Sequence, residues 1–288
     1  MRYFALAALA LLAAAPKPLT PIDIVAAAPA SAWRRIAPED LLVIDFKAGP
    51  RVVIQLAPAF APVHVANIRA LARAHWWDGA AIYRVQDNYV VQWGHNDYRK
   101  LSAGIVARPP AEYVRPLAGL PVTRFAYRDS YAPRAGYASG WPVAIDGRTA
   151  SLTHCYAYVG VGRDLAPDTG TGGELYAVIG HAPRQLDRNI AVVGRVIAGI
   201  EAMSSLPRGT DALGFYKERS SDVPIASTRL ASDLPPADRP DFEVMDTASA
   251  SFAAYLAKRA NRRDDFYRRA AGGVDLCNAP VPVRPVKR

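Results

Sequence analysis

The apolar positions of this chain fall into short runs at strand spacing, interrupted once by a helical pattern. Residues 41–46 (LLVIDF) and 51–56 (RVVIQL) are separated by AGP, a turn signal, and are predicted to form a hairpin. Residues 62–74 instead space their apolar side chains for one face of a helix, as Val65 and Ile68 show. We expect this helix to cover one open end of a sheet.

Polar side chains are interleaved with β-branched ones in the stretch IYRVQDNYVVQWGH, residues 82–95. Gln-Asp-Asn stands at its centre, where a hairpin can turn, so two strands are expected. Arg84 and Gln92 are an even number of residues apart and share one face only if the turn keeps the register. These polar side chains are either the solvated face of a sheet or the floor of a binding site.

Further strand signals follow in the second half of the chain, with short connections between them. They cover residues 151–161, 174–180, 190–196, 224–230 and 242–245. The third of these runs into a short helix that ends near residue 206. The predicted fold is mainly β. Because a closed sheet leaves no exposed edge to pair with other chains, we expect a closed antiparallel barrel capped by helices.

Segments without strand periodicity divide the chain. The expected parts are a signal peptide at 1–15, an Ala- and Pro-rich linker at 16–38, the main domain at 39–246, and a C-terminal helix with a basic, Pro-rich tail at 247–288. Within the main domain, residues 96–147 have many Pro, Gly, Tyr and Arg and little periodicity, so we expect a long insertion of irregular structure. The C-terminal helix is predicted over residues 248–270, with Phe252, Tyr255 and Leu256 on one face.

Composition and charge narrow the class of protein. The chain has 288 residues, of which 51% are hydrophobic and 21% charged, as is typical of globular proteins. The formal charge of +9 comes mostly from Arg spread along the chain, which indicates solubility rather than a nucleic-acid site. The C-terminal cations form either a solvated helix face or a weak contact to an acidic partner or membrane surface. They are Lys258, Arg259, Arg262, Arg263, Arg268 and Arg269. We expect a monomer.

The N-terminus indicates export. One positive charge precedes an apolar run over residues 3–15, and Ala13 and Ala15 fit a signal-peptidase site, with Pro16 leaving the cleavage position open. The run is shorter than the roughly 20 residues of a membrane-spanning helix. We therefore expect a periplasmic or secreted protein.

Two cysteines, Cys155 and Cys277, lie far apart in a chain expected in an oxidising compartment, where a disulfide can persist. Sequence spacing cannot show whether two Cα atoms come within bonding range. A single long-loop disulfide and two buried free thiols both stay open.

The sequence lacks the usual motifs for metal, nucleotide and nucleophile chemistry. The five histidines have no metal-ligand spacing such as H-E-x-x-H, so no metal is expected. The Gly-rich run at residues 160–174 has neither G-x-G-x-x-G nor G-K-[ST] and is interpreted as a loop of the barrel. Ser139 is not in a G-x-S-x-G elbow, which argues against a hydrolase. We expect no cofactor.

Four segments carry a family resemblance: VVIQLAPAFAPVHVANIRAL, IYRVQDNYVVQWG, GGELYAVIG and LDRNIAVVGRVIAGIEAM. Their order, composition and spacing resemble the cyclophilin-type peptidyl-prolyl isomerases over residues 41–245, without the insertion. The resemblance implies an eight-stranded β-barrel capped by two helices, and an enzyme that isomerises X-Pro bonds of proline-containing polypeptides without a cofactor. The family has His-Arg, a hydrophobic dipeptide, Pro-Gly, Phe and then Gln-Gly-Gly. This chain has Tyr83-Arg84, Val85-Gln86, Asp87-Asn88, Tyr89 and then Gln92-Trp93-Gly94.

The resemblance implies roles for residues of the polar hairpin. Amide resonance opposes rotation about an X-Pro bond with a barrier of roughly 18–20 kcal/mol, and the prolyl nitrogen gains a usable lone pair in the twisted transition state. A permanently charged guanidinium aimed at that nitrogen stabilises the transition state more than the planar ground state. The resemblance gives this role to Arg84 and orientation of the substrate backbone to Gln92. It gives the apolar pocket for the proline ring to Tyr89 and Val90.

This chain departs from the family pattern at pocket positions. Glu174 replaces a Gln and adds a negative charge, while Tyr176 keeps one of two aromatic residues. Gln185 stands where many members have a Trp that contacts the inhibitor cyclosporin, so weak sensitivity to that drug is expected. Ile190 replaces a His or Tyr and removes a hydrogen-bonding partner. The expected substrate-binding residues are Tyr89, Val90, Glu174, Tyr176, Leu186 and Ile190.

Two functions follow from these matches and departures. The first is an exported prolyl isomerase that assists the folding of other exported chains. The second is a peptide-binding or chaperone module that keeps the groove with weak or no catalysis, and whose insertion and C-terminal helix contact partners. Arg84 favours the enzyme, whereas Tyr89, Trp93 and Ile190 favour the binding module.

Overall fold

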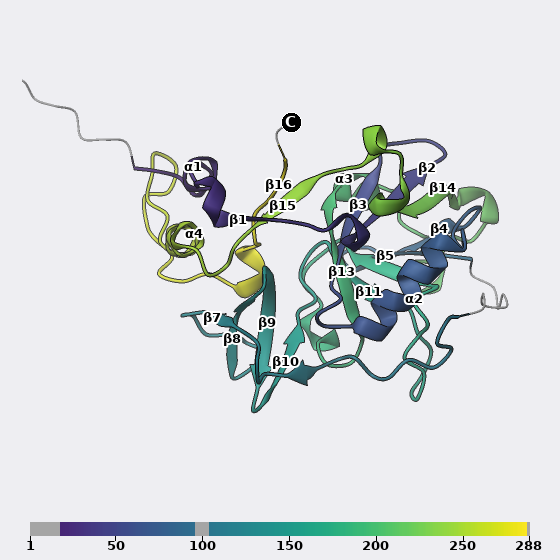
Figure 1. Ribbon diagram of the computed structural model, residues 1–288, viewed down its shortest axis with the longest axis horizontal. Coiled ribbons are helices and arrows are strands. Elements are labelled where there is room, and N and C mark those ends of the chain that lie inside the picture. The colour runs from purple at the N-terminus through teal and green to yellow at the C-terminus, as the bar shows by residue number, and fades with distance from the viewer. Residues whose placement is uncertain (1–17, 96–103, 287–288) are drawn as a thin grey trace, which may run out of the picture.

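The computed structural model describes residues 18–95 and 104–286, and its largest part is a β-barrel (Figure 1). Eight strands close the barrel, and every neighbouring pair is antiparallel. In order around it they are β11 (Tyr158–Val161), β12 (Leu175–Val178), β5 (Val90–Gly94), β4 (Ala81–Val85), β14 (Val223–Leu230), β2 (Leu41–Phe46), β3 (Val52–Leu56) and β13 (Val192–Ala198). The predicted fold, mainly β with a closed antiparallel eight-stranded barrel, is confirmed.

Alternation along the strands separates a filled interior from an outer face. Val91 and Trp93 of β5 and Leu175 of β12 lie in the main apolar core and are buried. The side chains between them, such as those of Gln92 and Tyr176, therefore point away from the barrel axis. Any site built from these polar residues lies on the outside of the barrel.

Helix α2 (Pro62–Arg73) packs across the barrel where the sequence predicts a helix (Figure 1). Its first turn is capped from outside the helix, since the carboxylate of Glu112 accepts the N–H groups of Val63 and His64 at 2.8 and 2.9 Å. A carboxylate at this end satisfies unpaired donors and complements the helix dipole. Helix α3 (Ile200–Ser204) follows β13, also as predicted.

The insertion contains a β-sheet of its own, so the prediction of irregular structure is wrong. Its strands run in the order β6-β10-β9-β8-β7. They are β6 (Arg115–Pro116), β7 (Val122–Arg124), β8 (Arg134–Ala138), β9 (Trp141–Asp146) and β10 (Thr149–Leu152). The first two of these strands have two and three residues, and Pro and Gly stand in and between the others, so the sequence shows little periodicity. Trp141 and Val143 pack with the barrel residue Val192, which ties the sheet to the barrel. Residues 96–103 of the predicted insertion lie outside the described residues.

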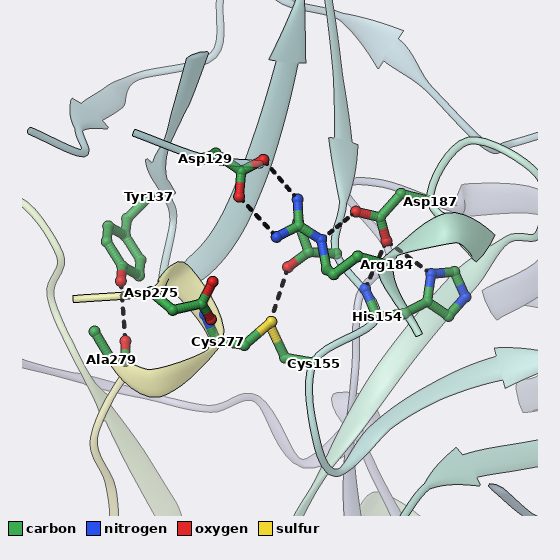
Figure 2. The surroundings of a disulfide bond; sticks show 10 residues. Asp129, Tyr137, His154, Cys155, Arg184, Asp187, Asp275, Cys277 and Ala279 are labelled. Atoms are coloured by element: carbon green, nitrogen blue, oxygen red, sulfur yellow. Dashed lines mark hydrogen bonds and ion pairs between the residues drawn. A yellow bond between two sulfur atoms is a disulfide. The ribbon is translucent and has the colours of Figure 1, made fainter. Parts of the chain in front are cut away.

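The predicted strand over residues 151–161 is two strands in two different sheets, because the chain turns between β10 and β11. The carboxylate of Asp187 pins this turn by accepting the backbone N–H of His154 at 2.8 Å. In the same turn Cys155 forms a disulfide with Cys277, with Cα atoms 5.1 Å apart (Figure 2). Of the two alternatives for the cysteines, the structure contains the bridge.

A three-stranded sheet lies outside the barrel. It contains β1 (Trp33–Arg35), β15 (Phe242–Met245) and β16 (Val283–Pro285), in the order β1-β15-β16. The strand predicted at 242–245 therefore exists, but it pairs with segments from the two ends of the chain rather than with the barrel. Residues 18–38, expected as a linker, contain β1 and part of the apolar core beneath this sheet.

Two helices pack together beside this sheet, at the left of Figure 1. They are α1 (Pro21–Ala26) and α4 (Ala250–Ala260). Helix α4 buries Phe252, Tyr255 and Leu256 as predicted but ends ten residues before the expected position, where the chain enters the polar run NRRDD at residues 261–265. No helix in residues 18–95 or 104–286 is long and apolar enough to cross a membrane. The predicted signal peptide lies outside the described residues.

Candidate functional site

The polar hairpin is formed by β4 and β5, and a β-bulge at Tyr83 shifts its register on the side away from the turn. Ile82 pairs with Trp93 and Arg84 pairs with Gln92, so β4 has one extra residue, Tyr83, between these pairs. The bulge interrupts the alternation of sides, so Tyr83 joins Arg84 on the outer face while Ile82 is fully buried inside. The turn keeps the register, so Arg84 and Gln92 share a face, which was the condition set by their spacing.

These side chains belong to a row that crosses four strands on the outer face. Gln92 of β5 pairs with Tyr176 of β12, and Tyr176 pairs with Gly160 of β11. A Cβ atom at Gly160 would lie 2.3 Å from the Cζ and Oη atoms of Tyr176. The missing side chain at Gly160 therefore gives the Tyr176 ring its place in the row, beside Gln92 and, one strand further, Arg84.

The guanidinium of Arg84 is held by three neutral oxygens. Its Nη1 donates to Oε1 of Gln92 at 2.9 Å, its Nε to the carbonyl oxygen of Leu213 at 2.8 Å, and its Nη2 to Oε1 of Gln86 at 2.5 Å. The ring centroid of Phe215 lies 5.3 Å from Cζ. Within the described parts of the chain, no carboxylate forms an ion pair with Arg84. Burial lowers the pKa of Arg84, but a guanidinium stays a cation.

Gln92 is fixed from its other side by Tyr83 and Glu174. Its Nε2 donates to the hydroxyl of Tyr83 at 2.7 Å, and that hydroxyl donates to Oε2 of Glu174 at 2.5 Å. Oε1 of Glu174 accepts the backbone N–H of His95 at 2.9 Å. Burial, reinforced by the charge of Glu174, raises the pKa of Tyr83, so the hydroxyl keeps its proton. We call the four side chains Arg84, Gln92, Tyr83 and Glu174 the Arg84–Glu174 relay.

An apolar cluster lies next to the relay on the same outer face. Val90, Tyr176 and Val178 are buried together, and Tyr89 and Ile190 pack against them. Val90 pairs with Val178 across β5 and β12, two residues along from the pair formed by Gln92 and Tyr176. These five residues, called the apolar patch below, include four of the residues predicted to bind substrate.

Tyr176 is held at its hydroxyl by a buried histidine. Nε2 of His154 lies 2.9 Å from the Tyr176 hydroxyl, and Nδ1 of His154 donates to Oδ1 of Asp187 at 3.0 Å. Burial raises the pKa of Tyr176 well above its ordinary value. Leu186 is half-buried in the short 3₁₀ turn before Asp187 and is not a member of the apolar patch, so its predicted contact with substrate stays a prediction.

A cavity of about 400 Å³ adjoins the relay, within the roughly 300–1,000 Å³ of ligand sites. Tyr83, Gln92, Glu174 and Phe215 form one side of it, and the loop between β11 and β12 forms the other. The cavity can therefore receive a segment of polypeptide that passes over Gln92. In residues 18–95 and 104–286, no group of three or more His, Cys, Asp or Glu side chains is arranged to hold a metal ion.

The structure adds site residues to which the sequence assigned no role. Leu213 is 129 residues from Arg84, and it comes with Phe215 from the segment after α3. No local pattern points to such a distant contact. Tyr83 had a signal, because it stands directly before Arg84 where the family has His. His154 had none, since it is one of five histidines isolated in the sequence.

The fold is a closed eight-stranded antiparallel barrel, and its candidate site is an Arg–Gln pair beside an apolar patch on the outer face. The family model described as cyclophilin type peptidyl-prolyl cis-trans isomerase/CLD matches residues 41–230. The chain belongs to this family, and its class is that of a peptidyl-prolyl cis-trans isomerase enzyme.

Individual relatives agree with the family match. Proteins named probable peptidyl-prolyl cis-trans isomerase from Brucella suis biovar 1 and Brucella abortus are each 24% identical over 175 residues, which is 61% of this chain and 75% of theirs. The crystal structure of cyclophilin AquaCyp293 from Hirschia baltica is similar with a TM-score of 0.71 at 23% identity, covering 93% of this chain and 98% of that one. This structural likeness concerns the fold, and it extends beyond residues 41–230.

Proposed function

We propose that this protein isomerises X-Pro bonds of exported polypeptides, with Arg84 stabilising the twisted transition state. The observation that carries the proposal is the environment of the Arg84 guanidinium. Three neutral oxygens hold it beside the apolar patch, and no carboxylate in the described parts of the chain neutralises it. An Arg has five N–H donors, so two are left for a substrate.

Electrostatics connects this geometry to rate. In a planar X-Pro amide the nitrogen lone pair is delocalised, and a cation gains little from it. In the twisted state the lone pair is localised, and a donor of Arg84 binds it. Because this interaction is made mainly in the transition state, it raises kcat rather than only lowering KM. Loss of one such donor typically costs about 10²- to 10³-fold in kcat.

The residues around Arg84 would bind the substrate. The apolar patch takes the proline ring, which packs on Tyr89, Val90 and Ile190 above the ring of Tyr176. Gln92, oriented by the Arg84–Glu174 relay, binds the backbone of the polypeptide. The cavity beside Gln92 receives the adjoining residues of the substrate chain. No cofactor enters this scheme.

The test measures isomerisation of short X-Pro peptides by NMR exchange spectroscopy. Arg84→Ala should lower kcat/KM about 100-fold, and Arg84→Lys should restore part of it because the charge returns without the planar fork. Arg219→Ala is the matched control, since it removes a 71% exposed cation from the segment after α3. The control should stay within about twofold of wild type. Equal acceleration by wild type and folded Arg84→Ala would refute the role of Arg84.

Export is the second part of the proposal. Residues 1–15 have the pattern of a signal peptide, and a disulfide such as Cys155–Cys277 is typical of oxidising compartments. Expression in a bacterial host with a periplasm, followed by fractionation and mass spectrometry, tests this. We expect the full chain in the periplasm with a shortened N-terminus, and a variant lacking residues 2–15 in the cytoplasm. A full chain found in the cytoplasm with an intact N-terminus would contradict export.

A peptide-binding module with little catalysis is the second candidate. The Phe215 ring over the Arg84 guanidinium favours it, because the ring reduces the space next to the cation, and so does the hydroxyl that Tyr89 adds to the apolar patch. Calorimetry with an Ala-Pro peptide, run beside the kinetic assay, separates the two. Binding without acceleration would select the module.

A further inference from the structure

A series of buried polar side chains connects the insertion to the apolar patch, and Figure 2 shows it from Asp129 to His154. It begins at Asp129, in the segment between β7 and β8, whose two carboxylate oxygens accept from Nη1 and Nη2 of Arg184 at 2.8 and 2.9 Å. Nε of Arg184 then donates to Oδ2 of Asp187 at 2.5 Å. Oδ1 of Asp187 accepts from His154, and His154 contacts the hydroxyl of Tyr176.

The four side chains that lead to Tyr176 are shielded from water. The side-chain exposure is 0% for Asp129, 2% for Arg184, 3% for Asp187 and 1% for His154. A buried ion pair adds little to stability compared with apolar side chains of the same size, because desolvation offsets the attraction. It does hold its members in one arrangement, since each would lose its partner in any other. These connected side chains are therefore better suited to positioning their neighbours than to stabilising the fold.

The arrangement ends at a defined orientation of the His154 ring. The carboxylate of Asp187 can only accept, so Nδ1 of His154 has a proton and donates it. With Nδ1 fixed in this way, Nε2 faces the hydroxyl of Tyr176, which is its partner at 2.9 Å. Any shift of Arg184 or Asp187 therefore reaches the phenol.

Tyr176 passes this constraint on to the substrate site. Its ring lies over the backbone of Gly160 on one side and is part of the apolar patch on the other. It is also the cross-strand neighbour of Gln92. A ring released at its hydroxyl would shift within the patch where the proline ring is expected to lie.

We infer that Asp129, Arg184, Asp187 and His154 are positioning residues that act through Tyr176 to shape the apolar patch, so that the insertion sets how tightly the site holds proline. This inference rests on the proposed isomerase function. It assigns the insertion a part in the site although its sheet lies beside the barrel, outside the row of relay side chains. Substrate binding, rather than the transition-state interaction of Arg84, is the step it affects.

The experiment is a double-mutant cycle on KM and kcat for an X-Pro peptide. Asp129→Asn keeps the size of the side chain and weakens its hold on Arg184. We expect it to raise KM three- to tenfold with kcat within twofold of wild type. In a Tyr176→Phe background, where His154 has no hydroxyl to hold, the same substitution should change KM by less than 1.5-fold. Equal KM effects in both backgrounds, or an unchanged KM in folded Asp129→Asn, would overturn the inference.

Two further variants serve as a control and as a replacement. Asp146→Asn breaks the exposed ion pair with Arg188, which also joins the insertion to the turn at Asp187, and should leave KM within 1.5-fold. His154→Asn replaces Asp129→Asn if the latter fails to fold, because it keeps a donor toward Asp187 and withdraws the group facing Tyr176. The same dependence on the Tyr176 hydroxyl is expected.

A binding measurement separates this inference from the proposed function. The dissociation constant of the same peptide, measured by calorimetry, replaces KM if the wild type shows no acceleration. Absence of acceleration would then reject the isomerase proposal alone. Loss of the Asp129→Asn effect in the Tyr176→Phe background would still support the positioning role, and additive effects on binding would reject it.

Discussion

Tyr83→Phe deletes one hydroxyl at the centre of the Arg84–Glu174 relay and leaves the aromatic ring in place. In the wild type that hydroxyl accepts from Gln92 at 2.7 Å and donates to Glu174 at 2.5 Å. The ring itself stacks on Phe215 with centroids 5.9 Å apart, a contact that the substitution keeps. The variant therefore tests the hydrogen bonds separately from the packing.

The expected loss of stability follows from the two hydrogen bonds of the Tyr83 hydroxyl. A hydrogen bond to a charged group contributes about 1.5–3 kcal/mol and a neutral one about 1 kcal/mol. Gln92 and Glu174 are only half-buried, and water can replace part of both bonds, so we expect a loss of about 2 kcal/mol in the free energy of unfolding. Gln92 also loses the partner of its amide nitrogen. A loss of about 1.4 kcal/mol of transition-state stabilisation lowers kcat/KM about tenfold.

Urea unfolding and NMR exchange on an X-Pro peptide measure the two effects. Tyr89→Phe is the control for stability, because in the described parts of the chain the Tyr89 hydroxyl forms no hydrogen bond and the ring is half-buried. It should change the free energy of unfolding by less than about 0.5 kcal/mol. If Tyr83→Phe keeps its stability as closely as this control and its kcat/KM within twofold of wild type, the relay does not orient Gln92.

Two further predictions concern stability. Cys155→Ala/Cys277→Ala removes a cross-link that spans 122 residues, which should cost about 4 kcal/mol and lower Tm by roughly 10 °C in a calorimetric scan; a fall under 3 °C would contradict this. The hydrogen bonds from Arg229 lower the pKa of Asp78, so this pair stabilises the fold above the unfolded pKa of about 4 and its contribution is lost as the pH falls through the folded pKa. Between pH 6 and pH 3 the urea midpoint of Asp78→Asn should therefore fall less than that of wild type, and equal falls would exclude this role.

The sequence was most informative where contacts are local. The hairpin of β2 and β3 was predicted because two β-branched runs flank a turn signal, and the bounds of β2 match the expected 41–46. The insertion sheet was missed although β8, β9 and β10 are joined by tight turns, because Pro and Gly within and between these strands hide their alternation. Only β6 pairs across distance, with β10 through Arg115 and Ala150. The pairing of β15 with β1 and β16 likewise depends on segments near opposite ends of the described chain.

In the site, too, local contacts could be predicted from the sequence and distant ones could not. Arg84 and Gln92 could be placed from the family pattern, because both lie on one hairpin whose turn pairs them directly, as it also pairs Val85 with Val91. Phe215 and Asp129 could not, since they reach the site through tertiary contacts that leave no periodic or motif signal. Their roles follow only from the distances to Arg84 and, through Arg184, to Tyr176.

The direction of the Arg84–Glu174 relay follows from its two ends. Arg84 can only donate and the carboxylate of Glu174 can only accept, so Gln92 must present its carbonyl to Arg84 and its amide nitrogen to Tyr83. In the sequence, Tyr83 and Glu174 are separate departures from the family pattern. In the structure they form one hydrogen bond, in which the Tyr83 hydroxyl donates and the Glu174 carboxylate accepts. The negative charge lies beyond Tyr83 as seen from Arg84. It therefore orients the amide without forming an ion pair that would draw the guanidinium away from a prolyl nitrogen.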